Sequence, residues 1–258
     1  MITFEDLSLI KPLQNAISEL GFAKPTPIQQ KSFSVVRSGS DVLGIAQTGT
    51  GKTLAYMLPI LQDLKYSKID TPRVLVLVPS RELVIQVVNR INEFSSYMNV
   101  RVLGVYGGTN INTQKKACST GVDIIVATPG RLYDLAACRA LQLKTVKQLV
   151  IDEVDIMLDL GFRVKLANIF SILKDRRQNI MFSATMTEDV DSLIDDYFIK
   201  PNKISIAVSG TPLDNITQQC YNVKNFYTKL NLLKYILSDR EVFGKVLVFA
   251  CNKKHADI

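Results

Sequence analysis

The chain has 258 residues, of which 47% are hydrophobic, and its formal net charge is +7. This length suits one large α/β domain, or one domain and part of another, and the hydrophobic content excludes a disordered chain. No apolar run approaches the roughly 18–20 residues that a membrane span needs, and residues 1–6 lack the pattern of a signal peptide. We therefore expect a cytoplasmic protein without a membrane partner.

The positive charge fits a nucleic acid partner, because phosphates attract lysine and arginine whatever the base sequence. Charge alone equally fits a solvated surface, so this interpretation depends on the motifs described below. The single histidine, His255, excludes a catalytic triad based on histidine in the body of the chain, and also a site with several histidine ligands. Any general base is therefore expected to be a carboxylate.

Short apolar segments alternate with segments of helical pattern along residues 1–208. Most of the apolar segments are rich in Val, Ile and Leu without polar alternation, which is typical of strands buried on both faces. The predicted strands span 40–45, 73–79, 100–106, 123–127, 148–151, 179–182 and 203–208. Predicted helices begin at Leu54 and span 81–97, 113–120, 130–137 and 187–198. This alternation predicts an α/β fold with a mostly parallel sheet flanked by helices.

The pattern changes after the last of these strands. Ser209-Gly210-Thr211-Pro212 is typical of a linker, which we expect to span 209–214. Residues 215–258 then begin a partial second α/β unit, with predicted strands at 215–222 and 245–250 and a predicted helix at 229–238. The predicted domains are therefore 1–208 and 215–258.

The most informative segment, A-Q-T-G-T-G-K-T from Ala46 to Thr53, connects the first predicted strand to the first predicted helix. Glycines let the backbone turn tightly, so that successive N–H groups can point at phosphate oxygens, and the helix N-terminus adds its dipole. Lysine would reach the β- and γ-phosphates, and the last threonine would hold Mg²⁺. The expected nucleotide contacts are Thr48, Gly49, Thr50, Gly51, Lys52 and Thr53. A flexible loop with an exposed lysine is the alternative, and Ala46 departs from the usual first glycine of this pattern.

Two carboxylates, Asp152 and Glu153, follow the predicted strand at 148–151. A carboxylate at the end of a hydrophobic strand is typical of the group that meets the Mg²⁺ of a bound nucleotide. Asp152 would hold the metal through water, and Glu153 would orient and deprotonate the attacking water. The alternative is an acidic helix N-terminus, where these residues are favoured in any case.

Polar clusters follow most of the predicted strands. In parallel α/β folds ligands bind at the carboxyl ends of the strands, so these clusters are expected to share one edge of the sheet. They comprise 49–53, 79–83, 107–108, 128–131, 152–155 and 183–185. The sequence therefore predicts one extended site along that edge.

Together these residues resemble the DEAD-box family of ATP-dependent RNA helicases, and the resemblance runs from Phe4 to about Thr185. Phe4, Gly21-Phe22 and Pro25-Thr26-Pro27-Ile28-Gln29 are similar to the family's Q motif, which recognises adenine. An amide such as that of Gln29 can donate to and accept from adenine's N6/N7 edge. The resemblance implies that Phe4 stacks on the base and that Thr26 belongs to the same site. Without the family, 25–29 would be a helix start and Phe4 a core residue.

Further motifs of the family are present along the chain. Ser183-Ala184-Thr185 matches its S-A-T, whose hydroxyls contact the second-motif acid, here Asp155, and couple nucleotide to RNA. Three segments resemble motifs that contact an RNA backbone, and each has a structural alternative as a turn or a helix cap. The residues expected to contact RNA are Pro79, Ser80, Arg81, Gly107, Gly108, Thr128, Pro129, Gly130 and Arg131.

Two positions depart from the family pattern. Val154 replaces the alanine of the family name and adds bulk, which could alter coupling between the sites, and Ser80 replaces the usual threonine. Residues 246–252 resemble the family's motif IV, and nothing after them resembles motifs V and VI. We therefore expect this chain to bind adenine nucleotide without unwinding RNA.

The resemblance implies the first RecA-like domain of a helicase of bacterial type, followed by a fragment of the second. Its expected reaction is hydrolysis of ATP to ADP and phosphate, with Mg²⁺, coupled to local separation of RNA strands. One alternative is an RNA-binding or annealing module gated by ATP without productive hydrolysis. Another, a DNA helicase or a different P-loop ATPase, is disfavoured by the segments at 25–29 and 128–131.

Overall fold

The computed structural model describes residues 2–206 and 217–257 of the chain. These residues belong to two units, 1–210 and 211–258. The linker predicted at 209–214 lies outside the described residues, as does the end of the strand predicted at 203–208. The division into domains at 208 and 215 therefore stays a prediction.

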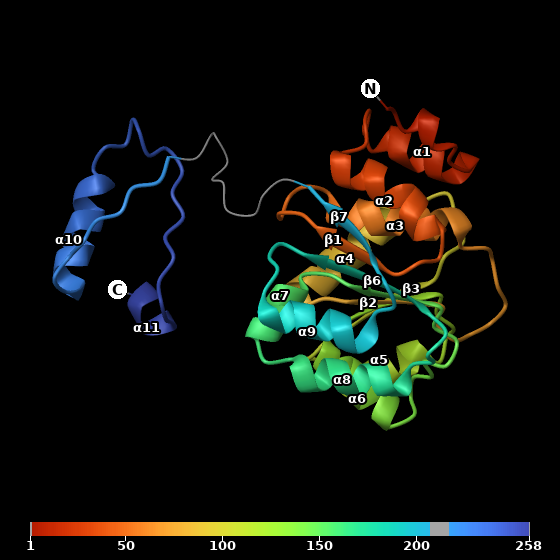
Figure 1. Cartoon of the computed structure of the whole chain (residues 1–258). Coiled ribbons are helices and arrows are strands. Elements are labelled where there is room, and N and C mark those ends of the chain that lie inside the picture. The colour runs from red at the N-terminus through yellow and green to blue at the C-terminus, as the bar shows by residue number, and fades with distance from the viewer. Residues whose placement is uncertain (1, 207–216, 258) are drawn as a thin grey trace. The chain divides into compact units, whose positions relative to one another are not determined.

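A parallel sheet of seven strands forms the centre of the first unit (Figure 1). Its order is β3-β4-β2-β5-β6-β1-β7, and all six pairings between neighbouring strands are parallel. The strands are β1 (Val42–Ile45), β2 (Val74–Leu77), β3 (Val102–Val105), β4 (Ile124–Ala127), β5 (Gln148–Ile151), β6 (Gln178–Ser183) and β7 (Asn202–Ser205). The predicted parallel α/β fold is thus confirmed.

Helices cover both faces of the sheet because alternate residues of each buried strand point to opposite faces. On β2, Val74 and Val76 pack in one hydrophobic cluster and Leu75 and Leu77 in another. The first cluster includes residues of α1 (Lys11–Glu19), α2 (Pro27–Arg37), α3 (Lys52–Asp63) and α4 (Arg81–Phe94). The second includes residues of α5 (Ile111–Cys118), α6 (Pro129–Ala137), α7 (Val154–Asp159), α8 (Arg163–Ile172) and α9 (Glu188–Tyr197). Each face therefore has its own core, as the apolar strands without polar alternation predict.

Besides α7, which begins directly after the two carboxylates at 152–153, three helices of the first unit had no counterpart among the predicted helices. Both α1 and α2 carry proline in their first turn, where its missing N–H costs no hydrogen bond. The third, α8, buries Leu166, Ile169 and Phe170 against the second core. A short 3₁₀ helix, η1 (Glu5–Leu7), precedes them. The proline signals could have located the first two helices from the sequence.

The second unit differs from its predicted form. Its helices are α10 (Phe226–Ile236), close to the helix predicted at 229–238, and α11 (Lys253–Ala256). The strand predicted at 215–222 is wrong over 217–222, and the buried strand predicted at 245–250 is wrong as well, since Leu247 is 78% exposed and Phe249 88%. A strand needs a neighbour to pair its backbone groups, and no described residue pairs with this segment.

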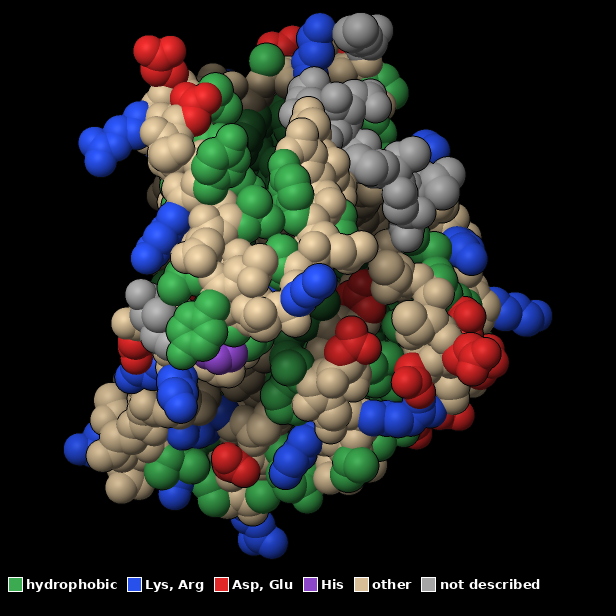
Figure 2. Space-filling view, turned by 90° about the vertical axis from the view of Figure 1, so that its left-hand side faces the viewer, with side chains coloured by type: hydrophobic (Ala, Val, Ile, Leu, Met, Phe, Trp, Pro, Cys, Tyr) green, Lys and Arg blue, Asp and Glu red, His purple; other side chains and the backbone are tan. Residues whose placement is uncertain are grey.

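Neither helix of the second unit buries a residue. Phe226 stacks on the ring of His255, with 4.5 Å between ring centroids. In Figure 2 the purple side chain is His255, and hydrophobic side chains are visible at the surface beside it. The described part of this unit thus lacks the two-sided core of the first. No helix among the described residues of either unit is long and apolar enough to cross a membrane.

Candidate functional site at the carboxyl edge of the sheet

A cavity of about 580 Å³ lies beside the segments that follow β1, β2 and β5. Its lining includes Phe4, Gln29, Lys52, Asp152 and Glu153, which are far apart in the sequence. All these strands are parallel, so their carboxyl ends meet at this edge, as the sequence predicts. The cavity therefore brings together the three sets of residues for which we predicted contacts with phosphate, adenine and metal.

The loop between β1 and α3 has the backbone that a phosphate cradle needs. Gly49 and Gly51 have φ of 81° and 86°, in the left-handed region that other residues rarely adopt. A side chain at Gly51 would also collide with the amide of Gln29. Lys52 is the first residue of α3, so the loop and the lysine lie at a helix N-terminus, which favours anions.

The amine of Lys52 is unusual because it is buried without a partner. The residue is 6% exposed, and its Nζ has no hydrogen bond within the described part of the chain. This contradicts the alternative of a flexible loop with an exposed lysine. A buried cation without a partner costs free energy, so its presence indicates an anionic ligand that is not part of the chain.

Asp152 lies at the end of β5 with its two carboxylate oxygens in different environments. Oδ2 accepts a hydrogen bond of 3.0 Å from the Tyr56 hydroxyl, whereas Oδ1 is buried and has no partner among the described residues. Burial raises the pKa of Asp152, while the charge of Lys52 opposes that shift. A buried oxygen without a partner fits a metal ion or its bound water, so the residues present fit the predicted Mg²⁺.

Glu153 occupies a strained backbone position next to Asp152. It has φ of 55° and ψ of 48°, a left-handed conformation that is uncommon outside glycine and that clusters at active sites. Burial and the neighbouring Asp152 raise the pKa of Glu153, which makes this carboxylate a stronger base. Both features fit the predicted role in deprotonating water. Glu153 precedes α7, so the alternative of an acidic helix start describes its position as well.

The S-A-T segment contacts Asp155, as predicted, through one hydroxyl only. Thr185 donates its hydroxyl to Oδ2 of Asp155 at 2.9 Å, and the backbone N–H groups of Ala184 and Thr185 donate to the same oxygen. The Ser183 hydroxyl donates instead to the carbonyl of Thr185 at 2.6 Å. The predicted contact of Ser183 with Asp155 is therefore wrong, because its position at the end of β6 turns its side chain into the bend of the segment.

Thr26 and Gln29 join the start of α2 to the phosphate loop. The Gln29 amide accepts from the backbone N–H of Thr26 at 2.9 Å and donates to the carbonyl of Gly51 at 3.1 Å. The Thr26 hydroxyl donates to the carbonyl of Thr50 at 2.9 Å. An amide has two donors and two lone pairs, so one of each remains for adenine. The helix-start interpretation of this segment is thus correct in this structure, and it leaves room for the adenine contact.

Phe4 fits both of its interpretations. It is 6% exposed and belongs to the first hydrophobic core, yet it also lines the cavity. Phe22 lines the same cavity. The core holds the Phe4 ring rigidly at the cavity wall, and its contact with a base stays a prediction.

The segments predicted to contact RNA follow β2, β4 and β3, three neighbouring strands at one end of the sheet order. Arg81 is exposed, and its guanidinium lies 5.1 Å from the ring centroid of Tyr106. Gly107 and Gly108 are exposed after β3, and no atom would obstruct a side chain at Gly130. The set therefore lies at the carboxyl ends of three neighbouring strands, and its contact with RNA stays a prediction.

Several members of this set also have structural roles. Ser80 caps α4 by accepting from the N–H of Leu83 at 3.2 Å, and Pro79 is buried. Arg131 donates to the side chain of Gln114 and to the carbonyl of Thr109. Pro129 is buried in the first turn of α6, and Thr128 stands at the N-cap without a capping bond from its hydroxyl. These bonds fix the segments in place, which is compatible with contact to a ligand.

Tyr56 contacts Asp152 directly and was not among the site residues predicted from the sequence. Tyr56 is fully buried, and burial raises its pKa well above the usual value. It follows Lys52 by four residues on α3, a spacing that places two side chains on one helix face. That spacing was a usable signal, although nothing in the sequence pairs the hydroxyl with a residue 96 positions away.

Comparisons with known proteins place the chain in a family. Residues 26–193 match the family described as DEAD/DEAH box helicase. The chain is 35% identical over 261 residues to "DEAD-box ATP-dependent RNA helicase 30" of Arabidopsis thaliana, an alignment that covers 100% of this chain and 44% of that protein. It is 36% identical over 252 residues to "ATP-dependent RNA helicase DeaD" of Escherichia coli, covering 97% of this chain and 40% of that protein. The chain thus spans less than half the length of these relatives, and a bacterial type stays a prediction.

A solved structure has a similar fold. It is the "hypothetical ATP-dependent RNA helicase from Sulfolobus tokodaii", with a TM-score of 0.70 and 33% sequence identity. The match covers 77% of this chain and 57% of the other. The predicted RecA-like helicase fold is therefore confirmed.

Proposed function

We propose that this chain, which belongs to the DEAD/DEAH box helicase family, binds ATP in the cavity at the carboxyl edge and forms part of an ATP-dependent RNA helicase. One observation carries the proposal. Two buried polar atoms of opposite charge, Lys52 Nζ and Asp152 Oδ1, belong to one cavity, and both lack partners among the described residues. A triphosphate with its metal ion is a ligand that satisfies both.

In the proposed complex each part of ATP has its own contacts. Phe4, Thr26 and Gln29 hold adenine, while Thr48, Gly49, Thr50, Gly51 and Lys52 hold the phosphates. Thr53, and Asp152 through water, would hold Mg²⁺, which supplies charge neutralisation on the phosphates when bound. The free donor and free lone pair of the Gln29 amide match adenine N7 and N6–H.

Hydrolysis in this proposal depends on Glu153. Its carboxylate orients a water molecule and takes a proton from it, as the raised pKa favours. Lys52 places its positive charge against the β- and γ-phosphates, where negative charge develops during cleavage. Asp155 and Thr185 link the segment after β5 to the segment after β6, so a shift on cleavage can pass between neighbouring strands.

The proposed RNA contacts lie along the segments after β2, β3 and β4. Arg81 and Arg131 supply charge, while Ser80, Thr128 and the backbone at Pro79, Gly107, Gly108, Pro129 and Gly130 supply donors and close approach. Phosphate contacts of this kind position a strand without reading its sequence. The whole protein's unwinding activity and a cytoplasmic location also belong to this proposal.

The first test is adenine selectivity. We expect ATP to displace a fluorescent ATP analogue from this chain at a concentration at least about tenfold lower than GTP requires. Guanine O6 accepts where adenine N6 donates, so GTP would leave the Gln29 amide unpaired. Gln29→Ala should lose the preference for ATP over GTP, whereas its matched control Gln30→Ala, which removes the neighbouring amide of α2, should keep it. Equal affinities for ATP and GTP would contradict the adenine contacts.

The second test is phosphate release from ATP and Mg²⁺ with and without single-stranded RNA. Release that rises with RNA supports the helicase function. Nucleotide-dependent RNA binding without release would favour the alternative of an RNA-binding module gated by ATP.

A further inference from the structure

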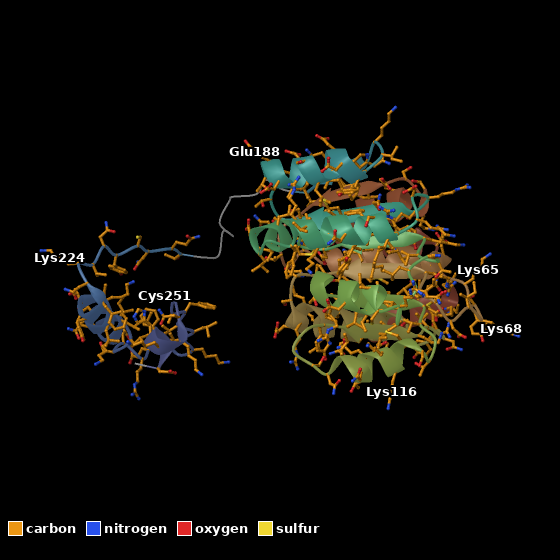
Figure 3. The ribbon with its side chains drawn as sticks, turned by 90° about the horizontal axis from the view of Figure 1, so that it is seen from below. Lys65, Lys68, Lys116, Glu188, Lys224 and Cys251 are labelled. Carbon is orange, nitrogen blue, oxygen red and sulfur yellow. The ribbon has the colours of Figure 1, made fainter. Side chains whose placement is uncertain are left out.

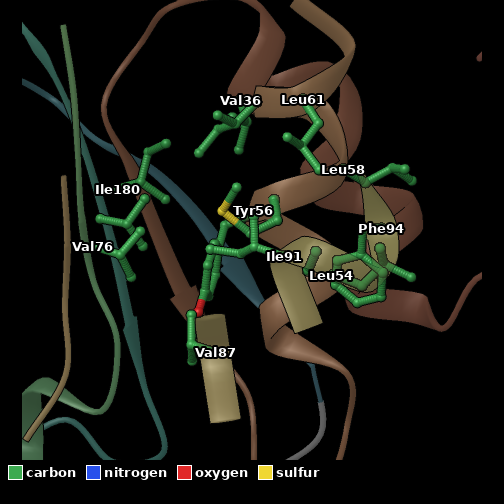
Figure 4. Close-up of a cluster of buried hydrophobic side chains, with 14 of the residues drawn as sticks. Val36, Leu54, Tyr56, Leu58, Leu61, Val76, Val87, Ile91, Phe94 and Ile180 are labelled. Atoms are coloured by element: carbon green, nitrogen blue, oxygen red, sulfur yellow. The ribbon is translucent and has the colours of Figure 1, made fainter. Parts of the chain in front are cut away.

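A tyrosine hydroxyl lies inside the first hydrophobic core, beside the proposed nucleotide site. Tyr56 is fully buried on α3 among apolar side chains, with Val76, Val87 and Ile180 nearby in Figure 4. Its ring packs against Phe182 of β6, with 5.5 Å between centroids. A phenylalanine would make the same apolar contacts, so the packing alone does not require the hydroxyl.

The hydroxyl has a specific acceptor. It donates to Oδ2 of Asp152 at 3.0 Å, and burying a hydroxyl without such a bond would cost free energy. Because this bond occupies Oδ2, the other oxygen of Asp152 is the one without a partner. The hydroxyl therefore makes the two oxygens of the carboxylate unequal.

Lys52 and Asp152 do not form an ion pair, although both are buried and line one cavity. The ion pairs among the described residues include neither of them. Opposite charges in a poorly hydrated site attract strongly, so their separation needs an opposing interaction. The hydrogen bond from Tyr56 to Asp152 is such an interaction.

We propose that Tyr56 is a positioning residue that holds the Asp152 carboxylate away from Lys52 and thereby keeps the nucleotide site open. The inference rests on the proposed function of the cavity. Without the hydroxyl, the carboxylate turns and pairs with Lys52, and only a fraction of the molecules remain ready to bind. The apparent affinity falls to that fraction of the intrinsic affinity, because the ligand binds only the open state.

The test is Tyr56→Phe, with nucleotide affinity measured by displacement of a fluorescent ATP analogue in EDTA and across a Mg²⁺ titration. We expect about tenfold weaker binding in EDTA, since Lys52 is then held by Asp152, and a higher Mg²⁺ concentration for half-saturation. A thermal unfolding midpoint close to that of the parent shows that the variant is folded.

The matched control is Tyr197→Phe, which removes the same atom from a ring stacked on Phe170 of α8. Its affinity and its Mg²⁺ dependence should equal those of the parent. A similar loss in this control would show that the effect is not specific to the Asp152 bond, and would overturn the proposal.

A second comparison separates positioning from packing. In an Asp152→Asn background the amide carries no charge to pair with Lys52, so adding Tyr56→Phe should change the EDTA affinity by less than about twofold. An equal loss in both backgrounds, or no loss in the parent background, would overturn the inference alone. A parent chain that binds no nucleotide would overturn the proposed function, and this inference with it.

Discussion

The two edges of the central sheet treat charge in opposite ways. At the amino edge, Asp123 has a side chain 5% exposed and forms ion pairs with Arg73 at 2.8 Å and Arg101 at 3.0 Å. The charge of Arg73 is thus paired, although its Nε makes no hydrogen bond of its own within the described residues. At the carboxyl edge, Lys52 Nζ and Asp152 Oδ1 are buried without partners in the described structure. In Figure 3, Lys65 and Lys68 lie at one end of the first unit and Glu188 lies toward the opposite end.

The difference separates stability from function within one fold. Charges that satisfy each other join the segments that precede β2, β3 and β4, since Arg101 also donates to Asp70 and to the carbonyl of Ile69. Charges without partners lower stability and indicate a ligand. Substitutions at the carboxyl edge should therefore remove function without lowering stability, and those at the amino edge should do the reverse.

The largest expected effect is on turnover at the carboxyl edge. Glu153→Gln keeps shape and hydrogen bonding but removes the proposed base, so hydrolysis of ATP should fall by about 10²–10⁴-fold while ATP still binds. Phosphate release and displacement of a fluorescent ATP analogue measure the two quantities. Hydrolysis at the rate of an active parent would refute the role of Glu153 in catalysis.

A smaller effect is expected on stability at the amino edge. Asp123→Asn should lower the free energy of unfolding by about 2 kcal/mol at pH 7, because it leaves Arg73 and Arg101 without their anion. Urea unfolding measures the loss, and nucleotide affinity should stay unchanged. Asp63→Asn, in an exposed pair with Arg37, is the matched control and should cost less than about 1 kcal/mol.

The same substitution has a pH dependence with a definite sign. Burial alone would raise the pKa of Asp123, but hydrogen bonds from Arg101 and Arg73 outweigh it and hold the pKa below its ordinary value of 3.8. Its contribution is therefore complete above pH 3.8 and is lost as the pH falls through the lower pKa of the folded protein. Parent and Asp123→Asn should converge in acid, and a constant difference would contradict this account.

The smallest expected effect is a gain in stability at the carboxyl edge, opposite in sign to the loss expected for Asp123→Asn. Asp152→Asn, without nucleotide and Mg²⁺, should raise the free energy of unfolding by about 1 kcal/mol at neutral pH, because it removes a buried charge that has one oxygen without a partner. Chemical denaturation measures the gain. A loss of stability would show that the ionised carboxylate is satisfied, and would remove the contrast between the two edges.

Strands and the phosphate loop could be predicted because their signals are local. The apolar segment V-L-V-L at 74–77 forms a buried strand, and glycines at 49 and 51 have the positive φ that the loop requires. Prediction failed for V-L-V-F-A at 246–250, which has the same local pattern but no neighbouring strand among the described residues. A pattern specifies that a strand can be buried, and only a partner buries it.

The sequence by itself determined the family, the phosphate loop and the two acidic residues after β5, because each depends on residues that are close together in the chain. The tertiary structure decided contacts between distant residues: Tyr56 with Asp152, the Gln29 amide with Gly51, and Thr185 rather than Ser183 with Asp155. It also decided the strand order that places these segments at one edge. Hydrogen bonds of this kind depend on the donor–acceptor distance to within a few tenths of an ångström and on the direction of the donor. Both are set only when the whole sheet and its helices pack together.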